Sequence, residues 1–428
     1  MSVSRQHLFP SGWSRRRLRF DVRTNPVKSE LDLPDDTEVS FVPMDAVGEL
    51  GGLRLDQTRE LADTYNGYTY FADGDVCVAK ITPCFENGKG AIAEGLTNGV
   101  AFGTTELHVL RPSPTLDGRF LFYLTIAHDF RSYGESEMLG AGGQKRVPEG
   151  FLKDWIPPLP RIEVQQRIAR FLDEKTARID ALIEKKQVLL ERLAEKRQAL
   201  ITRAVTKGLN PDVAMKPSGV DWLGDIPAHW EIKRLSFISS VIDCKHRTPE
   251  YIDDGIALVS TSEIKPYSID YESKRRVSEA EFQMMSEGGR RPVVGDIIYS
   301  RNASVGSAAM VRSNQEICLG QDLCLIRPKA FHAAYLEFFQ NSGVSLEQLN
   351  QELVGATFKR VNVDAVKKYF TLVPPMSEQI GVVEYLEHCL RSEDAIQACV
   401  IQSLELLLEH RSTLITSAVT GQLPELNG

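Results

Sequence analysis

Basic side chains recur at matching places in two parts of the chain, and their chemistry suits contact with a polyanion. Lys80 closes the apolar segment GDVCVAK, and Arg301 closes its counterpart GDIIYSR. The polar loops that follow carry Lys89 in the first case and Asn302 in the second. Ammonium, guanidinium, amide and backbone N–H groups are the donors that contact phosphates and base edges in nucleic acids. A β-turn with a solvated cation explains these residues equally well, so both interpretations stay open.

A second pair of basic segments follows later in each part. Two glycines precede Gln144-Lys145-Arg146, and Gly355 precedes Lys359-Arg360. Glycine lets the backbone approach a polyanion closely, and arginine can fork onto guanine or phosphate where lysine acts as a point charge. The alternative is a surface turn before a strand. The candidate contacts to nucleic acid are therefore Lys80, Lys89, Gln144, Lys145, Arg146, Arg301, Asn302, Lys359 and Arg360.

Motifs for catalysis are missing from the sequence. The Pro-Pro steps at 157–158 and 374–375 lack the Asn or Asp that opens the catalytic loop of an amino-methyltransferase. The segment 87–90, Asn-Gly-Lys-Gly, lacks the leading glycine and the Ser/Thr of a P-loop. The eight histidines form no H-E-x-x-H or other ligand cluster. We expect neither catalysis nor a metal or cofactor in this chain, although a nuclease carboxylate cluster leaves little trace in sequence.

Two long helices must position these residues, because the chain repeats itself 214 residues apart. Residues 159–206 realign on 373–420 without a gap, and prolines precede each copy. Internal repeats of this kind decide the fold before any local motif does. Each copy predicts a helix, over about 163–206 and 377–420, with a length near ~66 Å at 1.5 Å per residue.

Written as heptads, both helices carry an apolar stripe too wide to bury on one ordinary domain. Their a positions include Leu172, Ile179, Leu193, Leu200, Leu386, Val400, Leu407 and Leu414. Their apolar d positions are Ile168, Leu182, Leu189, Val382, Cys389 and Ile396, and Ile183 and Leu190 at e widen the first stripe. We expect the helices to pair with each other in antiparallel fashion, with one module at each end. The alternative is that each helix packs on its own domain.

The segments ahead of the helices also repeat, with an offset that drifts between anchors. Glu106 to Pro112 matches Asp322 to Pro328, for example. The matched segments are short, apolar and flanked by Gly, Pro and Asp, which predicts strands. Thr104-Thr105 and Gln321-Asp322 occupy matching turns with unlike chemistry, as two modules with different targets would need, although surface turns vary freely. The expected class is α+β, with domains 1–160 and 230–375, helices 161–207 and 376–421, a linker 208–229 and a tail 422–428.

Composition bounds the remaining possibilities. The 428 residues are 42% hydrophobic and 25% charged, and no apolar run approaches the ~20 residues of a membrane span. Residues 1–13 lack the apolar core of a secretory signal, and seven scattered cysteines favour reduced thiols in a cytoplasm. A net charge of −8 opposes a simple nucleic-acid binder. Contact with DNA would need a local basic patch, or a partner that supplies phosphate contacts.

The sequence strongly resembles the specificity subunit of type I restriction–modification enzymes. The resemblance rests on the two helix entries (PRIEVQQRI at 160–168 and PPMSEQI at 374–380) and on the linker SGVDWLGDIPAHW at 218–230. The loop KITPCFENGKG at 80–90 and the strand IYSRN at 298–302 also look like parts of target-recognition domains. One departure is Val164, where the second copy has Glu378.

This resemblance implies two target-recognition domains, each recognising one half of a split DNA sequence, with an antiparallel helix pair that fixes the gap. It implies no catalysis by this chain. The implied partners are double-stranded DNA, two modification subunits that bind S-adenosylmethionine, and restriction subunits that use ATP and Mg²⁺; no membrane is implied. A coiled-coil scaffold that joins proteins without touching DNA, and a solitary nuclease, are the other hypotheses.

Overall fold

The computed structural model describes residues 10–49, 51–141, 143–220, 222–353 and 360–427. The chain divides into two compact units, one formed by Met1–Lys186 with Ile401–Gly428 and the other by Gln187–Val400. Each unit holds one α+β module and one part of each long helix, α5 (Ile162–Lys207) and α11 (Met376–Val419). Within the described ranges, no helix is both long and apolar enough to cross a membrane.

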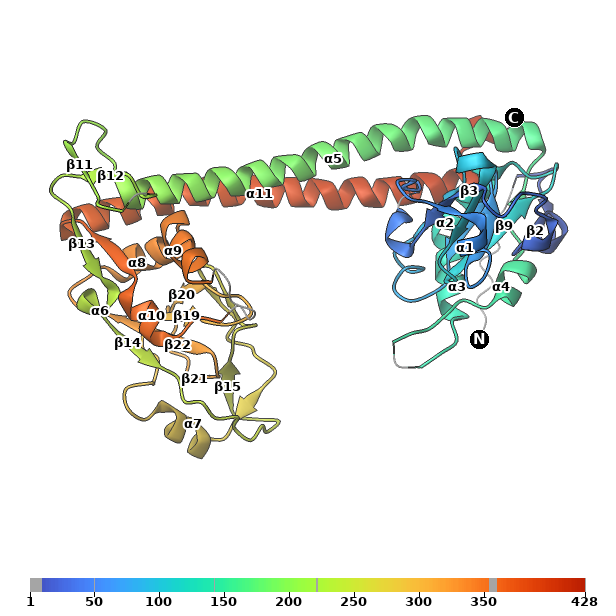
Figure 1. The fold of residues 1–428 in the computed structure, drawn as a ribbon. Helices are drawn as coiled ribbons and strands as arrows, with labels where there is room; N and C mark the ends of the chain where they lie inside the picture. Colours follow the sequence, from blue (N-terminus) through green and yellow to red (C-terminus); the bar gives the residue numbers. More distant parts are fainter. Residues whose placement is uncertain (1–9, 50, 142, 221, 354–359, 428) are drawn as a thin grey trace. The chain divides into compact units, whose positions relative to one another are not determined.

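The module of the first unit is built on a central antiparallel sheet (Figure 1). Its strand order is β2 (Val22–Thr24), β9 (Leu107–Pro112), β6 (Val76–Ala79) and β7 (Gly90–Ile92). A second sheet has the order β4 (Thr58–Glu60), β3 (Glu38–Val42), β8 (Val100–Gly103) and β5 (Thr69–Ala72), with β3 and β8 parallel. The other elements are β1 (Ser14–Arg15) paired with β10 (Pro158–Leu159), and helices α1 (Leu61–Thr64), α2 (Gly118–Ile126), α3 (His128–Ser136), α4 (Glu149–Asp154) and α12 (Pro424–Asn427).

The central sheet is buried on both faces, because its side chains alternate along each strand. Val76 and Val78 pack with Phe120 of α2 in one cluster. Cys77 and Ala79, one position along, pack with Phe71 of the second sheet in another. The strands β6 and β7 are therefore apolar throughout, whereas β9 also carries His108 and Arg111 and β2 carries Arg23.

The second unit repeats this plan with a different periphery. Its central sheet has the order β14 (Ser239–Asp243), β22 (Leu323–Pro328), β19 (Ile297–Ser300) and β20 (Ala308–Met310), strand for strand the order of the first. The second sheet has three strands, β18 (Arg276–Val277), β15 (Ile256–Val259) and β21 (Ile317–Leu319). The other elements are β11 (Met215–Pro217), β12 (Asp225–Pro227), β13 (Glu231–Arg234), β16 (Ile264–Lys265), β17 (Ser268–Ile269), β23 (Phe370–Val373), α6 (Leu235–Ile238), α7 (Glu279–Ser286), α8 (Ala333–Gln340), α9 (Gly343–Leu353) and α10 (Val363–Lys368).

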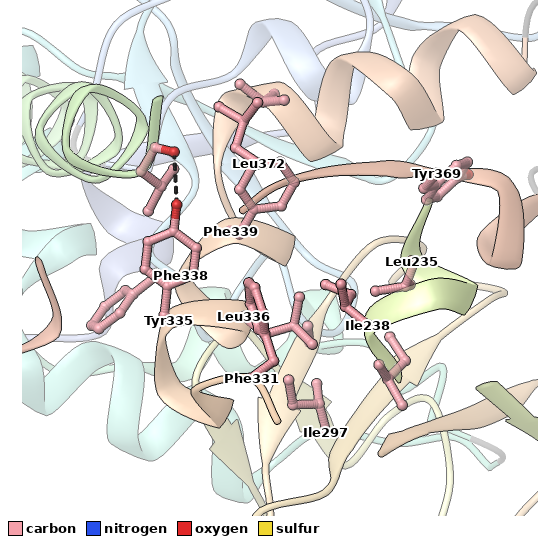
Figure 2. Packing of buried hydrophobic residues seen from close by; sticks show 14 of the residues in the cluster. Leu235, Ile238, Ile297, Phe331, Tyr335, Leu336, Phe338, Phe339, Tyr369 and Leu372 are labelled. Atoms are coloured by element: carbon pink, nitrogen blue, oxygen red, sulfur yellow. Dashed lines mark hydrogen bonds between the residues drawn. The ribbon is translucent and has the colours of Figure 1, made fainter. Parts of the chain in front are cut away.

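Helix α8 joins this module to the end of α5 (Figure 2). Phe338, Phe339 and Leu336 lie in the same buried cluster as Ile297 of β19. The hydroxyl of Tyr335, itself fully buried, donates to the carbonyl of Val205 on α5 at 3.1 Å. The module and its stretch of α5 therefore share one core.

The two long helices lie antiparallel within each unit. In the first unit Arg411 Nε is 2.7 Å from Asp180 Oδ1, and Leu172, eight residues earlier on α5, shares a cluster with Ile415. In the second unit Arg197 pairs with Asp394, and Val205, further along α5, shares a cluster with Leu386. Residues later in α5 therefore lie beside residues earlier in α11, so the two helices run in opposite directions. The α+β class with a long antiparallel helix pair, predicted from the sequence, is confirmed.

The apolar seam of the helices differs from the predicted one. Leu182 and Leu189, assigned to d positions, are 48% and 43% exposed, and Ile396 is 50% exposed. Ile183, assigned to e, is buried instead. The buried stripe of α5 runs through a and e positions and includes one polar residue, Thr176. The cationic d positions lie on the outer face together with Leu182 and Leu189. Of the eight a residues named above, Leu172, Ile179, Leu386 and Val400 are buried, and Leu193, Leu200, Leu407 and Leu414 are half-buried.

Each long helix ends in the same way. Gly208 after α5 and Gly421 after α11 adopt φ of +72° and +75°, the left-handed conformation that favours glycine at a helix C-terminus. A Cβ on Gly208 would lie 3.2 Å from Trp230, and one on Gly421 would lie 3.3 Å from Trp13. The two tryptophans begin the two modules, so each module starts against the end of a long helix.

Candidate nucleic-acid interface

The polar residues at one end of the first module's central sheet are brought together by backbone hydrogen bonds. Lys80, directly after β6, donates from its N–H to the carbonyl of Glu106, directly before β9, at 2.9 Å. The N–H of Val147 donates to the carbonyl of Lys80 at 2.8 Å. Three segments that are distant in sequence therefore meet at this end of the sheet.

Arg146 and Glu106 form a two-pronged ion pair at this place. Arg146 Nε lies 2.9 Å from Oε2 of Glu106, and Nη2 lies 2.8 Å from Oε1. The guanidinium holds the pKa of the Glu106 carboxyl below its usual value, chiefly through these hydrogen bonds. The Arg146 side chain is 44% exposed and that of Glu106 is 25% exposed. The pair thus sits at the surface with its carboxylate on the inner side.

The second module repeats this arrangement. The N–H of Arg301 donates to the carbonyl of Asp322 at 2.8 Å, and the N–H of Val361 donates to the carbonyl of Arg301 at 2.9 Å. Arg360 Nη2 lies 2.8 Å from Asp322 Oδ1. We call Glu106–Arg146 and Asp322–Arg360 the acid–arginine pairs. Their equivalence rests on the same backbone bonds at the same sheet end, not on sequence alignment alone.

Arg301 was predicted from the sequence to be an exposed DNA contact, but its side chain is buried, so this prediction is wrong. Its side chain is only 2% exposed, with Nη2 2.8 Å from Asp243 Oδ1 and Nη1 3.4 Å from the carbonyl of Val361. A guanidinium enclosed in this way cannot reach a phosphate or a base edge. The side chain instead ties the end of β19 to the end of β14.

The other predicted contacts occupy different surroundings. Lys80 and Asn302 are half-buried, and Gln144 and Lys145 are exposed. Lys89 donates from Nζ to the carbonyl of Met44, in the 3-10 turn that follows β3, at 3.1 Å. The described ranges do not include Lys359. The direct contact of these residues with DNA stays a prediction.

The second module carries a basic loop that has no counterpart in the first. Lys245, His246 and Arg247 are three consecutive residues separated from the end of β14 by Cys244, and no such run of basic residues follows β2. Lys245 Nζ lies 2.6 Å from a Glu287 carboxylate oxygen, and Arg247 Nη2 lies 2.7 Å from Glu281. Three adjacent basic residues are in themselves an indication of a nucleic-acid contact. They were missed from the sequence because only basic residues that recur in both modules were considered.

A cavity opens beside that loop, and another opens near Lys80 in the first module. The cavity of the second module has a volume of about 310 Å³ and is lined by Arg247, Thr248, Arg275 and Gln321, among others. Gln321 Nε2 donates to Thr248 Oγ1 at 2.9 Å, which joins the basic loop to the turn before β22. The cavity of the first module, about 510 Å³, is lined by Lys28, Tyr65, Tyr68 and Lys80, among others. Both lie beside the sheet ends that carry the acid–arginine pairs.

In the part of the chain that the structure describes, no group of three or more His, Cys, Asp or Glu side chains is arranged to hold a metal ion. All seven cysteines are free thiols. Burial raises the pKa of Cys77 and that of Cys324, so these thiols carry a proton at neutral pH.

The chain is thus a duplicated α+β protein in which each module presents an acid–arginine pair at the end of its central sheet. The family model of the type I restriction modification DNA specificity domain matches residues 10–192 and 290–406, which together exceed half of the chain. The chain belongs to this family.

Curated relatives match parts of the chain. The specificity subunits of the type I restriction enzymes EcoAI and EcoEI of Escherichia coli are each 42% identical to it, over 162 and 161 residues. These matches cover 37% of this chain but only 27% of each relative, so the chain spans about a quarter of their length. The EcoBI specificity subunit, also of Escherichia coli, is 23% identical over 293 residues, or 65% of this chain and 60% of that subunit.

A solved structure extends the likeness to nearly the whole chain. A study of complex assembly and conformational transition of the type I R-M system contains a chain with a TM-score of 0.71, covering 97% of this chain and 99% of that one. The sequence identity is 18%, so this likeness establishes the fold alone.

Proposed function

We propose that this chain is the sequence-specific, double-stranded DNA recognition subunit of a type I restriction–modification complex. Each module recognises one half of a bipartite target, and α5 with α11 sets the gap between the halves. The observation that carries the proposal is the duplicated acid–arginine pair: one scaffold presents an arginine at the same place twice, surrounded by loops of different sequence. Arginine at such a surface suits direct recognition of base edges.

The chain itself does no chemistry in this proposal. Methylation belongs to two modification subunits that bind S-adenosylmethionine, and cleavage belongs to restriction subunits that use ATP and Mg²⁺. This division is supported by the lack of catalytic motifs in the sequence and by the family to which the chain belongs. A cytoplasmic location, where such partners and their DNA would be found, is part of the same proposal.

Exposed apolar residues on the long helices support the proposal that partner subunits bind there. In the first unit Leu182, Leu406 and Leu408 are 48%, 58% and 45% exposed, and in the second unit Leu189 and Ile396 are 43% and 50% exposed. Contiguous apolar patches on a charged surface mark protein contacts, and in this proposal these side chains belong to such a patch. The family membership favours such contacts as part of a DNA-recognition complex over a scaffold that never meets DNA.

The test is methylation sequencing in a host that expresses this chain with its modification subunits. We expect one bipartite methylated motif, which disappears when the chain is deleted. Replacing residues 10–160 by the equivalent module of a family member should change one half of the motif and leave the other. A motif that survives deletion of the chain, or a module exchange that alters both halves, would refute the proposal.

A further inference from the structure

The first acid–arginine pair holds its arginine by one edge of the guanidinium, whereas in the second the contact is between Asp322 Oδ1 and Arg360 Nη2. Glu106 takes the Nε and Nη2 atoms of Arg146, which leaves Nη1 and the second hydrogen of Nη2 outside that pair. A guanine in the major groove offers O6 and N7, which accept a fork of two N–H groups from one arginine. The free edge of Arg146 has this geometry.

The backbone under Arg146 is fixed as well. Its N–H donates to the carbonyl of Leu139 at 2.8 Å, and its carbonyl accepts from the N–H of Leu139 at 2.9 Å. Leu139 is itself 70% exposed, so this small bridge stands at the surface of the module. An arginine that is held at both its backbone and its guanidinium loses little conformational freedom when it binds a base.

In the second module the carboxylate is the member that receives extra support. Asp322 places Oδ1 on Arg360, and its Oδ2 accepts from Asn302 Nδ2 at 3.1 Å. Aspartate is one methylene shorter than glutamate, so the guanidinium groups of the two modules lie at different distances from the same end of the central sheet. Two modules with different targets would need such a difference.

Stability alone is a poor reason for these carboxylates. Arg146 and Arg360 are 44% and 48% exposed, and ion pairs at exposed sites add little to stability. A carboxylate at a DNA-facing surface also repels phosphates, which lowers affinity. Its recurrence in both modules is explained if it orients the arginine and thereby adds selectivity.

We propose that Glu106 and Asp322 are positioning residues, which orient Arg146 and Arg360 to form forked hydrogen bonds with a guanine, one in each half of the DNA target. This inference rests on the proposed function. It goes further by assigning a base type to each module, and by assigning a role to two acidic residues at the surface of an acidic chain.

The experiment uses the full chain assembled with its modification subunits and measures methylation rates on DNA in which each target base pair is replaced in turn. Glu106→Gln should reduce discrimination at one guanine of the first half-site by about tenfold and leave the second half-site unchanged. Asp322→Asn should do the reverse. Arg146→Gln should affect the same guanine as Glu106→Gln, and the double variant should lose little more than Arg146→Gln alone, because the carboxylate acts through the arginine.

Matched controls remove a carboxylate that pairs with an exposed arginine elsewhere in the same unit. Glu94→Gln, whose partner is Arg119, serves the first unit, and Glu316→Gln, whose partner is Arg291, serves the second. Both should retain wild-type discrimination. Melting curves of all variants separate loss of folding from loss of selectivity, and Glu106→Asp should recover part of the lost selectivity.

The outcomes are distinguishable. A bipartite motif in the wild-type complex with no change at any position in Glu106→Gln and Asp322→Asn overturns this inference and leaves the proposed function intact. A change at a base other than guanine, or equal changes at both half-sites, also overturns it. No sequence-dependent methylation by the wild-type complex would instead refute the proposed function.

Discussion

Arg301 offers the sharpest test of the reasoning from burial, because the sequence and the structure assign it different roles. We predict that Arg301→Met destabilises the second unit. Breaking a fully buried ion pair costs about 3–5 kcal/mol. Asp243 keeps 35% of its side-chain exposure and a second partner in His246 at 3.0 Å. Water and His246 therefore recover part of that cost, and about 2 kcal/mol of lost unfolding free energy remains.

For a unit of this size, about 2 kcal/mol lowers the melting temperature by roughly 4–8 °C, which calorimetry of the whole chain can measure. Arg301→Lys, which keeps the charge but not the fork, should fall between the wild type and Arg301→Met. The control is Arg247→Met, where an arginine 50% exposed pairs with Glu281, with an expected loss below ~1 kcal/mol. If Arg301→Met melted like the wild type but lost recognition of one half-site, Arg301 would contact DNA and the argument from burial would be wrong.

Three further predictions concern the spacer, the partners and pH. Inserting or deleting a few residues within 163–206 should change the gap length of the methylated motif and leave both halves unchanged; altered half-site letters would contradict the spacer role. Leu406→Glu should weaken co-purification with the modification subunits, because it places a charge on an exposed apolar position, whereas Val294→Glu, 54% exposed on the second module, should not. The pKa of Glu106 is lowered, so its pairing with Arg146 is complete at neutral pH and is lost only as the pH falls through that depressed pKa. Base discrimination in the first half-site should therefore stay constant between pH 6 and 8, and a loss near pH 6 would show that another group controls it.

The fold was largely predictable because its strongest signal is long-range. A gapless repeat over residues 159–206 and 373–420 marks two helices of equal length, and their stripes predict that they pair. The seam itself was not predictable from apolar content, since Leu182 and Ile183 are adjacent and equally apolar, yet only Ile183 is buried. Polar residues also take part in the seam: Glu393 is buried, and Lys196 Nζ lies 3.0 Å from its carboxylate. The sequence does not reveal such a pair until both helices are placed.

The site was predicted in part, for a related reason. Recurrence along the chain predicted Arg146 and Arg360, whose backbone hydrogen bonds and acidic partners recur in both modules, and their contact with DNA stays a prediction. It failed for Arg301, because Asp243, which encloses its guanidinium, lies 58 residues away in sequence. It also gave no role to Glu106, and it singled out Asp322 only as part of a turn that differs between the two modules. The pairing of these carboxylates with Arg146 and Arg360 becomes visible only in the folded structure.

The pairing of cations with carboxylates bears on how an acidic chain can bind DNA. In the second module Arg360, Arg247, Lys245 and Arg275 each lie within 3.0 Å of a carboxylate. Cations that are already paired with carboxylates neutralise few phosphates, so few of the counterions condensed on the DNA are released and this release contributes little to affinity.

We therefore predict that the free chain binds DNA weakly and with a shallow salt dependence. The logarithm of its binding constant should fall with the logarithm of salt concentration by a slope below about 2, because each phosphate contact contributes about 0.9. Assembly with the modification subunits should steepen this slope several-fold, as measured by fluorescence anisotropy on one duplex across a salt series. The same steep slope for the free chain and the complex would mean that this chain supplies the phosphate contacts itself. In that case the carboxylates beside its arginines would not screen them from the DNA backbone.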